Sequence, residues 1–308
     1  MDSAKKVYIS NWGYNDVPNL EGKKALVTGS NSGLGYFTAK ALAQKGCHVI
    51  LGCRTLEKAN YTKNKLERLF PNAQLSSMEL DLSDFKKVIE TTKLIFENFN
   101  NLDLLINNAG IMHPPKTLNA QGFEIQFAVN HLSHMLLTLK LLPLLEKQGN
   151  SRIVTVTSGA QFFGKGGWNN LRAEKYYNKW ESYAESKLAN VTFAMDLHKK
   201  LINKNVFSLA AHPGIAKTNL FTAQKPNPNK FEKFSLSIFS PFFQSAEMGA
   251  LPQLFAATSL SAKSGEHYGP KYNFRGHPKL SPTAPLANKD SEQRNLWEKS
   301  MNIIGEFI

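Results

Sequence analysis

Short apolar runs alternate with longer amphipathic stretches from residue 23 to residue 214. This alternation of strands and helices favours a doubly wound α/β fold, in which a parallel sheet is covered on both faces by helices to give three layers. Ligands bind such sheets beyond the carboxyl ends of the strands, so the residues that follow each strand are the candidates for a site. Strands are predicted at 23–29, 47–53, 74–82, 102–110, 151–158 and 205–214, and helices at 34–45, 56–69, 84–99, 121–147 and 181–203.

After residue 214 the pattern loosens, and a Phe-rich segment at 231–243 is interrupted by Pro241. No shift in composition requires a second domain. We therefore predict an N-terminal extension over 1–20 and a single domain over 21–308, in which a segment at about 218–245 covers the substrate. A helix near 245–259, a strand at 267–274 and a C-terminal helix at 289–304 complete the predicted elements.

The chain has 37 basic and 24 acidic residues, a net charge of +13. Such a charge suits nucleic acid, a phosphate-bearing cofactor, an anionic membrane surface or simply a lysine-rich solvated surface. The lysines are scattered, without a dense basic block or an aromatic-studded RNA motif, so nucleic-acid binding is not expected.

Two further patterns bear on the compartment. Cys47 and Cys53 lie six residues apart in one apolar run, which favours free thiols in a reducing compartment over a disulfide framework. The first 20 residues hold no apolar core of a signal peptide, and the apolar run at 135–145 is broken by Lys140 and Pro143 and is too short to span a bilayer. The sequence therefore predicts a soluble, cytoplasmic protein without a transmembrane segment.

The first predicted strand runs into a glycine-rich loop, TGSNSGLG, at residues 28–35, and the loop opens a predicted helix. Glycine lets the backbone turn tightly and approach a pyrophosphate, which would lie on the helix N-terminus. A plain tight turn is the alternative, but the strand–loop–helix context is the one that dinucleotide binding requires. The predicted cofactor contacts in this loop are Gly29, Ser30, Asn31, Ser32, Gly33, Leu34 and Gly35.

The second predicted strand ends in LGCRT, so the position that an acid usually takes in NAD enzymes holds Cys53 followed by Arg54. An acid there binds the 2′-hydroxyl of the ribose, whereas the fixed, charged fork of arginine suits a 2′-phosphate. We therefore expect NADP(H) to be preferred over NAD(H). The alternative is that Arg54 is a solvated residue at a strand end.

The stretch SYAESKLAN, at 182–190, places Tyr183 and Lys187 on one face of a predicted helix. A free tyrosine, with a pKa near 10, is a poor proton donor and acceptor at neutral pH, but a nearby ammonium favours the phenolate and lowers that pKa. Ser158 ends the fifth strand, where its hydroxyl could hold a substrate oxygen, and Asn130 could mark a break in a helix that serves a proton relay. Glu185, between the pair, is expected to point elsewhere and to be solvated.

The spacing T-G-x-x-x-G-x-G, with NNAG at 107–110 and Y-x-x-x-K at 183–187, resembles the short-chain dehydrogenase/reductase family, and the resemblance implies a Rossmann fold. It also implies that Asn130, Ser158, Tyr183 and Lys187 form the catalytic set and that Tyr183 and Lys187 also contact the cofactor. Asp81, followed by Leu82, would hold the adenine amino group, although Asp81 or Ser83 could equally cap the next helix. Further cofactor contacts implied by the resemblance are Asn108, Ala109, Gly110, Pro213, Gly214 and Thr218.

The stretches LGCRTLEKAN, NNLRAEKYYN, YAESKLANVTF and NLWEKSMNII are similar to the retinol dehydrogenase and WW-domain-containing oxidoreductase branch, over about residues 20–305. This branch implies hydride transfer between NADP(H) and a carbonyl or alcohol of a lipophilic small molecule, such as a retinoid, a steroid or an aldehyde. Many retinol dehydrogenases carry an N-terminal membrane helix, and none is expected here, so retinol itself is not singled out. The side chains that could line an apolar pocket, or simply belong to the core, are Phe234, Phe239, Phe242 and Phe243.

Other interpretations remain open. A non-catalytic NADP-binding sensor or scaffold, or a protein held at a membrane surface by its charge and its Phe-rich segment, would fit parts of the pattern. The family often forms dimers or tetramers, so a homo-oligomer is compatible with the resemblance. His212 is expected to be structural, and His131 and His134 lack a third ligand nearby, so no metal site is predicted.

Overall fold

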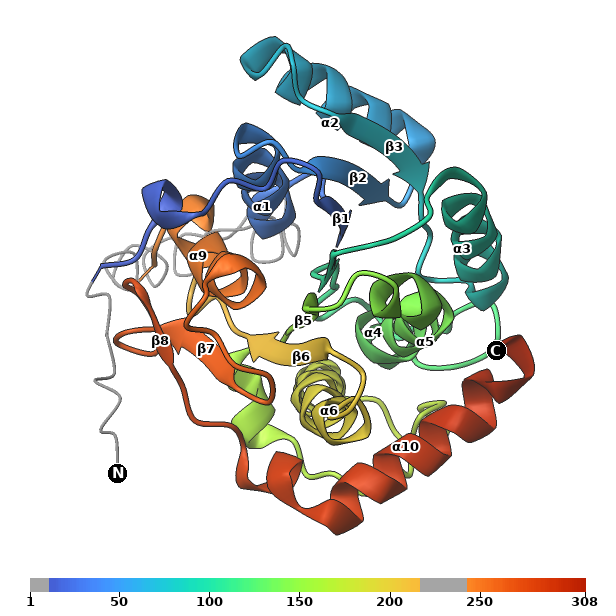
Figure 1. Ribbon diagram of the computed structural model, residues 1–308. Helices are drawn as coiled ribbons and strands as arrows, with labels where there is room; N and C mark the ends of the chain where they lie inside the picture. Colours follow the sequence, from blue (N-terminus) through green and yellow to red (C-terminus); the bar gives the residue numbers. More distant parts are fainter. Residues whose placement is uncertain (1–10, 217–242) are drawn as a thin grey trace, which may run out of the picture.

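The computed structural model describes residues 11–216 and 243–308, and this part of the chain forms one eight-stranded sheet with helices on both faces (Figure 1). The strand order is β3-β2-β1-β4-β5-β6-β7-β8, and the pairings are parallel up to β7, with β8 antiparallel to it. The predicted doubly wound α/β fold is confirmed. The strands are β1 (Lys24–Thr28), β2 (His48–Cys53), β3 (Leu75–Glu79), β4 (Leu104–Asn107), β5 (Ser151–Val156), β6 (Val206–Ala211), β7 (His267–Pro270) and β8 (Pro278–Leu280).

Two hydrophobic clusters, one on each face, hold the helices to the sheet. Alternate residues of a strand serve opposite faces, so Ile153 packs with α3, α5 and α6 while its neighbour Val154 packs with α1 and α9. Figure 1 shows α10 running along the outside of α6, where Trp297 stacks on Phe193. The longer helices are α1 (Gly33–Gln44), α2 (Leu56–Leu69), α3 (Phe85–Asn98), α5 (Ser133–Glu146), α6 (Lys179–Lys200), α9 (Ala246–Thr258) and α10 (Asp290–Ile304). Short turns are η1 (Tyr14–Asp16), α4 (Ile125–Phe127), η2 (Ala128–Leu132), η3 (Gly159–Phe163), η5 (Pro285–Asn288) and η6 (Gly305–Phe307).

Three local features differ from the sequence-based expectations. The helix predicted at 121–147 is interrupted, because η2 is a π-helical turn between α4 and α5. The strand predicted at 267–274 ends at Pro270, since the chain turns through Asn273 at φ 64° and returns as β8. Neither Asp81 nor Ser83 caps α3: the N-cap is Asp84, whose carboxylate accepts from the Lys86 N–H at 2.9 Å.

The N-terminal extension contributes to the core, which the sequence did not suggest. Trp12 is buried, and its ring meets Phe255 of α9 edge-on at 5.2 Å between centroids. Thr218, Phe234, Phe239 and Phe242 lie outside the described residues. Among the helices of 11–216 and 243–308, none is long and apolar enough to cross a membrane.

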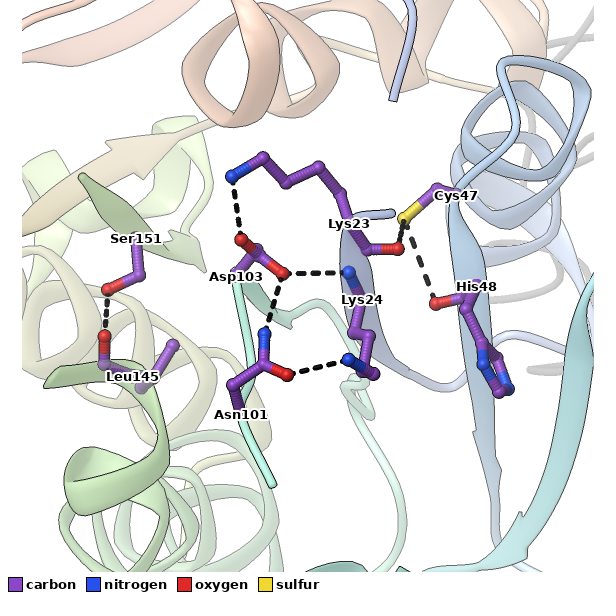
Figure 2. A network of polar contacts seen from close by, with 8 residues as sticks. All are labelled: Lys23, Lys24, Cys47, His48, Asn101, Asp103, Leu145 and Ser151. Carbon is purple, nitrogen blue, oxygen red and sulfur yellow. Dashed lines mark hydrogen bonds and ion pairs between the residues drawn. The ribbon is translucent and has the colours of Figure 1, made fainter. Parts of the chain in front are cut away.

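A polar network closes the amino ends of the strands (Figure 2). The buried carboxylate of Asp103, just before β4, accepts from the Lys23 ammonium at 2.8 Å, the Lys24 N–H at 2.9 Å and the Asn101 amide at 3.2 Å. Asn101 in turn accepts from the Lys24 ammonium at 2.6 Å, so every member has a partner. Cys47 also belongs to this edge as a free thiol, and burial raises its pKa to about 12, which makes it unreactive.

Candidate cofactor and active site

A groove of about 990 Å³ runs along the carboxyl ends of β1, β2 and β4. The glycine loop forms its floor, and the backbone at Gly29 and Gly33 has φ values of 67° and 52°. A side chain on Gly35 would put its Cβ 2.3 Å from the Gly29 carbonyl oxygen, so only glycine lets α1 approach the loop this closely. Of the predicted cofactor contacts, the groove is lined by Gly29, Asn31, Ser32, Gly33, Leu34, Gly35, Arg54, Asp81, Leu82, Asn108, Ala109 and Gly110.

Ser30 does not line the groove. Its side chain is buried beneath the loop, and its Oγ lies 3.2 Å from Cys53 Sγ. The predicted contact of Ser30 with a cofactor is therefore limited to its backbone. The groove passes the N-terminus of α1, where the backbone N–H groups that a helix leaves without intrahelical partners suit the pyrophosphate of a dinucleotide.

The NNAG turn is tied to the end of β1 by a hydrogen-bonded hydroxyl. Thr28 Oγ1 accepts from the N–H groups of Asn108 at 2.9 Å and Ala109 at 2.8 Å, while the Asn107 amide donates to Thr138 Oγ1 at 2.9 Å. These contacts hold β1, β4 and α5 together, so the turn has a structural role.

Arg54 follows β2 at the edge of the groove, and 70% of its side chain is exposed. Its Nε lies 3.6 Å from a carboxylate oxygen of Asp81, whose other oxygen accepts from the Ser83 N–H and hydroxyl at 2.9 and 2.6 Å. The guanidinium is therefore held beside the groove with most of its donors facing solvent.

Ser158, Tyr183 and Lys187 meet at the carboxyl end of β5. The Tyr183 phenol is buried, which raises its pKa, and a hydrogen bond with Ser158 opposes this effect. The Lys187 ammonium donates to the Val156 carbonyl at 3.2 Å and lies 5.8 Å from the centre of the Tyr183 ring. Burial lowers the pKa of Lys187 to about 8. The expected lowering of the phenol pKa by Lys187 is not found here, because burial dominates and Ser158 is the group that counters it.

Asn130 lies in the π-helical turn η2, which matches the expected helix break. Its side-chain oxygen accepts from the Ile111 N–H at 2.8 Å, and its amide donates to the Ile111 carbonyl at 3.0 Å and to Ser186 Oγ at 2.9 Å. A Cβ on Gly110 would lie 3.3 Å from this oxygen and 3.4 Å from Lys187 Nζ, so the three residues meet. The side chain of Asn130 thus joins the loop after NNAG to α6.

A second cavity, of about 650 Å³, opens beside the groove and shares Leu34 and Met112 with it. Ser158 and Tyr183 project into it, and the rest of its wall is mainly apolar, including Phe163, Trp180 and Pro213. Predicted contacts Pro213 and Gly214 line this cavity rather than the groove. The hydroxyls of Ser158 and Tyr183 therefore lie in a mainly apolar pocket that adjoins the groove.

Several wall residues were not identified from the sequence. His113, with φ 56°, places its ring 3.6 Å from that of Trp180 and 5.5 Å from that of Tyr183, between centroids. His113 and Trp180 belong to no motif. Both follow irregular segments, whose course hydrophobic periodicity does not predict.

The prediction that Glu185 is merely solvated is wrong. Its carboxylate accepts from the N–H groups of Lys165 at 2.6 Å and Gly166 at 3.2 Å, and burial raises its pKa. The loop after η3 folds back over α6 and covers this position, so Glu185 anchors the loop that carries part of the pocket wall.

His212 and His267 have packing roles. His212 lies beside His267 at 5.1 Å between ring centroids, and its Nδ1 accepts from the Gly214 N–H at 3.3 Å, which supports the turn after β6. Burial lowers the pKa of both, to about 3 and about 4. Among the residues that the structure describes, no group of three His, Cys, Asp or Glu side chains could hold a metal ion.

Comparisons with known proteins agree with this geometry. The sequence model of the short chain dehydrogenase family matches residues 23–229. Retinol dehydrogenase 11 of Homo sapiens is 35% identical over 288 residues, and retinol dehydrogenase 14 of Mus musculus is 36% identical over 298 residues. Each alignment covers 93% of this chain and 87% of the relative.

Solved structures show the same fold. An uncharacterised protein from Mycobacterium paratuberculosis is 31% identical, with a TM-score of 0.80 over 96% of this chain and 98% of that one. L-sorbose reductase from Gluconobacter frateurii, solved with NADPH and L-sorbose, is 20% identical, with a TM-score of 0.67. The match covers 82% of this chain and 95% of that one, and at this identity it supports a shared fold only. Because the family model covers more than half of the chain and the retinol dehydrogenases match nearly all of it, the chain belongs to the short-chain dehydrogenase/reductase family of oxidoreductases, in its retinol dehydrogenase-like branch.

Proposed function

We propose that this protein transfers a hydride between NADP(H) and the carbonyl or alcohol carbon of a lipophilic substrate of retinoid, steroid or aldehyde type. The observation that carries the proposal is the position of Ser158 and Tyr183, which line the mainly apolar pocket next to the groove. A bound nicotinamide would supply the hydride, and the residues around it would handle the oxygen and the proton.

In the reducing direction, Tyr183 donates the proton to the carbonyl oxygen while Ser158 holds that oxygen with its hydroxyl. The raised pKa of Tyr183 suits this role, because the phenol is protonated at neutral pH. Lys187, with a pKa of about 8, is mainly charged at neutral pH and can resupply the proton and bind the ribose. Asn130 holds the relay in place through its contact with Ser186.

The activity is tested by following NADPH oxidation against retinoids, steroids, quinones and aliphatic aldehydes. Tyr183→Phe should lose activity on every substrate that the wild type reduces, because the phenylalanine ring keeps the packing and removes only the proton donor. Tyr61→Phe is the matched control, since Tyr61 is 69% exposed and lies on α2, away from the pocket. A Tyr183→Phe variant with full activity would rule out this mechanism.

The preference for NADP(H) rests on Arg54. Its exposed guanidinium, at the edge of the groove after β2, suits a 2′-phosphate, and a charge-assisted pair of this kind contributes roughly ten- to hundredfold in affinity. Arg54→Ala should weaken NADPH binding by that factor and leave NADH binding unchanged. Lys87→Ala provides the control, because Lys87 also lines the groove but pairs with Glu90 at 2.9 Å. A wild type that binds NADH more tightly than NADPH would overturn the assignment.

A non-catalytic NADP sensor or scaffold is the alternative function. Such a protein would bind NADPH through the same groove and oxidise it with none of the carbonyl compounds. The binding and activity measurements therefore separate the two functions without a further variant.

Contact with a membrane surface is a second candidate, which we propose from the rim of the pocket. Phe163 and Trp180 line the pocket and are 78% and 63% exposed, and Phe162 and Tyr176 nearby are 49% and 53% exposed. Exposed aromatic rings beside lysines such as Lys165 are typical of the interfacial region of bilayers. The wild type should sediment with anionic liposomes, measured over a series of rising salt concentrations. The Phe163→Ser variant should bind the liposomes less. Equal recovery of wild type and variant would refute a role for the rim.

A further inference from the structure

His134 lies in the first turn of α5, is 1% exposed, and bridges two parts of the site that are distant in sequence. Its Nδ1 is 3.1 Å from the carbonyl oxygen of Asn130 in the π-helical turn. Its Nε2 is 2.9 Å from Thr28 Oγ1 at the end of β1. The ring therefore spans the distance between the strand that enters the glycine loop and the turn that carries Asn130.

The direction of these hydrogen bonds follows from their partners. The Asn130 carbonyl can only accept, so Nδ1 carries the hydrogen and Nε2 is the acceptor. The Thr28 hydroxyl donates to Nε2 at 2.9 Å rather than to the Ile106 carbonyl at 3.3 Å, which already accepts from the Asn108 N–H. Burial keeps the ring neutral by lowering its pKa to about 4, and the charge of Lys187 acts in the same direction. The hydrogen bonds are therefore all donated in one direction: the Thr28 hydroxyl donates to the imidazole, and the imidazole donates to the Asn130 carbonyl.

Each end of this chain reaches a functional element. Thr28 accepts from the N–H groups of Asn108 and Ala109, and these two residues line the groove. Asn130 holds Ser186, which lies on α6 between Tyr183 and Lys187. Because the side chains from Thr28 through His134 to Asn130 are buried, neither end can exchange its partner for water without a cost.

We propose that His134 is a positioning residue of the hydride-transfer site, with separate tasks for its two nitrogens. Nε2 holds the cofactor-binding loops in place through Thr28, and Nδ1 holds the π-helical turn and, through Asn130 and Ser186, the helix of the Tyr–Lys pair. This inference rests on the proposed function for its second half, whereas the first half concerns cofactor binding alone.

Two polar substitutions divide these tasks. The amide nitrogen of asparagine takes the place of Nδ1, so His134→Asn keeps the donor to Asn130 and loses the acceptor for Thr28. The amide oxygen of glutamine takes the place of Nε2, so His134→Gln keeps the acceptor and loses the donor. His134→Leu removes both. His131→Gln is the matched control, because His131 is the adjacent buried histidine and its Nε2 contacts Ser300 of α10 instead.

The measurements are the NADPH dissociation constant by titration, kcat and KM on a substrate of the wild type, and the melting temperature. Loss of one buried hydrogen bond is expected to change the affected parameter by about tenfold. His134→Asn should weaken NADPH binding and keep kcat, whereas His134→Gln should keep NADPH binding and lower kcat, each without a change in substrate KM. His134→Leu should show both defects. His131→Gln should keep wild-type NADPH binding and kcat.

A purely structural role of His134 would not produce opposite effects in the two variants, with NADPH affinity lost in His134→Asn and kcat lost in His134→Gln. If the three His134 variants lose NADPH affinity and kcat together, in step with their melting temperatures, or if all keep wild-type values, the proposal is wrong. If the wild type reduces none of the carbonyl compounds, the proposed function fails, but the NADPH affinities of His134→Asn and His134→Gln still decide the role of Nε2.

Discussion

Replacing Lys187 by methionine should abolish activity and yet stabilise the folded protein. Lys187 is 4% exposed, and the one hydrogen-bond acceptor resolved for its ammonium among the described residues is the Val156 carbonyl at 3.2 Å. Burying a charge with so little compensation is costly, and the cost appears in the pKa, which burial lowers from 10.5 to about 8. Methionine fills a similar volume, favours a helix and carries no charge.

The size of the effect follows from the pKa. At about 1.4 kcal/mol for each pH unit, the fall from 10.5 to about 8 corresponds to about 3 kcal/mol at neutral pH. Its pH dependence is specific. Below pH 8 the amine is charged in both the folded and the unfolded chain, and the full cost is present. Between pH 8 and 10.5 the folded protein has released the proton while the unfolded chain still holds it, so the wild type gains stability as the pH rises.

The test is urea unfolding of the wild type and Lys187→Met at pH 7 and near pH 10.5. The variant should be more stable by about 3 kcal/mol at pH 7, and the difference should nearly vanish at the higher pH. Lys93→Met, on the exposed face of α3, is the control and should change little at either pH. A Lys187→Met protein that is less stable than the wild type at pH 7, or a difference that does not depend on pH, would refute the reasoning.

Three other outcomes are expected. Acidification from pH 7.5 to 5 should lower the free energy of unfolding by about 2 kcal/mol for each of four buried histidines, which are His131, His134, His212 and His267. Their pKa values in the folded protein, about 3 to about 4, lie below the ordinary 6.5, so between these pH values only the unfolded chain binds the proton. Unchanged midpoints of urea unfolding would contradict this. Asp103→Ala should lower stability by about 3 kcal/mol by leaving the buried partners of the carboxylate unpaired, with normal kcat below the melting transition. Gly35→Ala should lose NADPH binding in a titration, since its Cβ would meet the Gly29 carbonyl, whereas Gly305→Ala has open space and should bind normally.

The order of the elements could be predicted because burial leaves a periodic trace in the sequence. All residues of β5 are buried, and the helical spacing of Tyr183 and Lys187 holds on α6. The carboxyl ends of parallel strands meet at one edge, so motifs that follow different strands could be assigned to one site before any distance was known.

The parts that could not be predicted depend on segments without periodicity or on pairs far apart in the chain. Glu185 faces away from the Tyr–Lys pair, as its helical position indicates, but the loop that covers it has no such signal. Thr28 and His134 lie in different predicted elements, and no spacing rule relates a strand end to a residue in a distant helix. The same holds for His113 and Trp180, which meet only because an irregular loop returns to the start of α6.

The two edges of the sheet therefore differ in how their charges are satisfied, and this difference explains why opposite signs are expected for Lys187→Met and Asp103→Ala. At the amino edge, Asp103 has three donors, and removing it leaves the Lys24 N–H and the buried Asn101 amide without this partner (Figure 2). At the carboxyl edge, the ammonium of Lys187 is buried with one resolved acceptor, and removing it relieves a cost. A buried charge with few partners lowers the stability of the fold, and such charges are found at functional sites. The carboxyl edge, where Lys187 has this cost, is also the edge at which the proton is proposed to move.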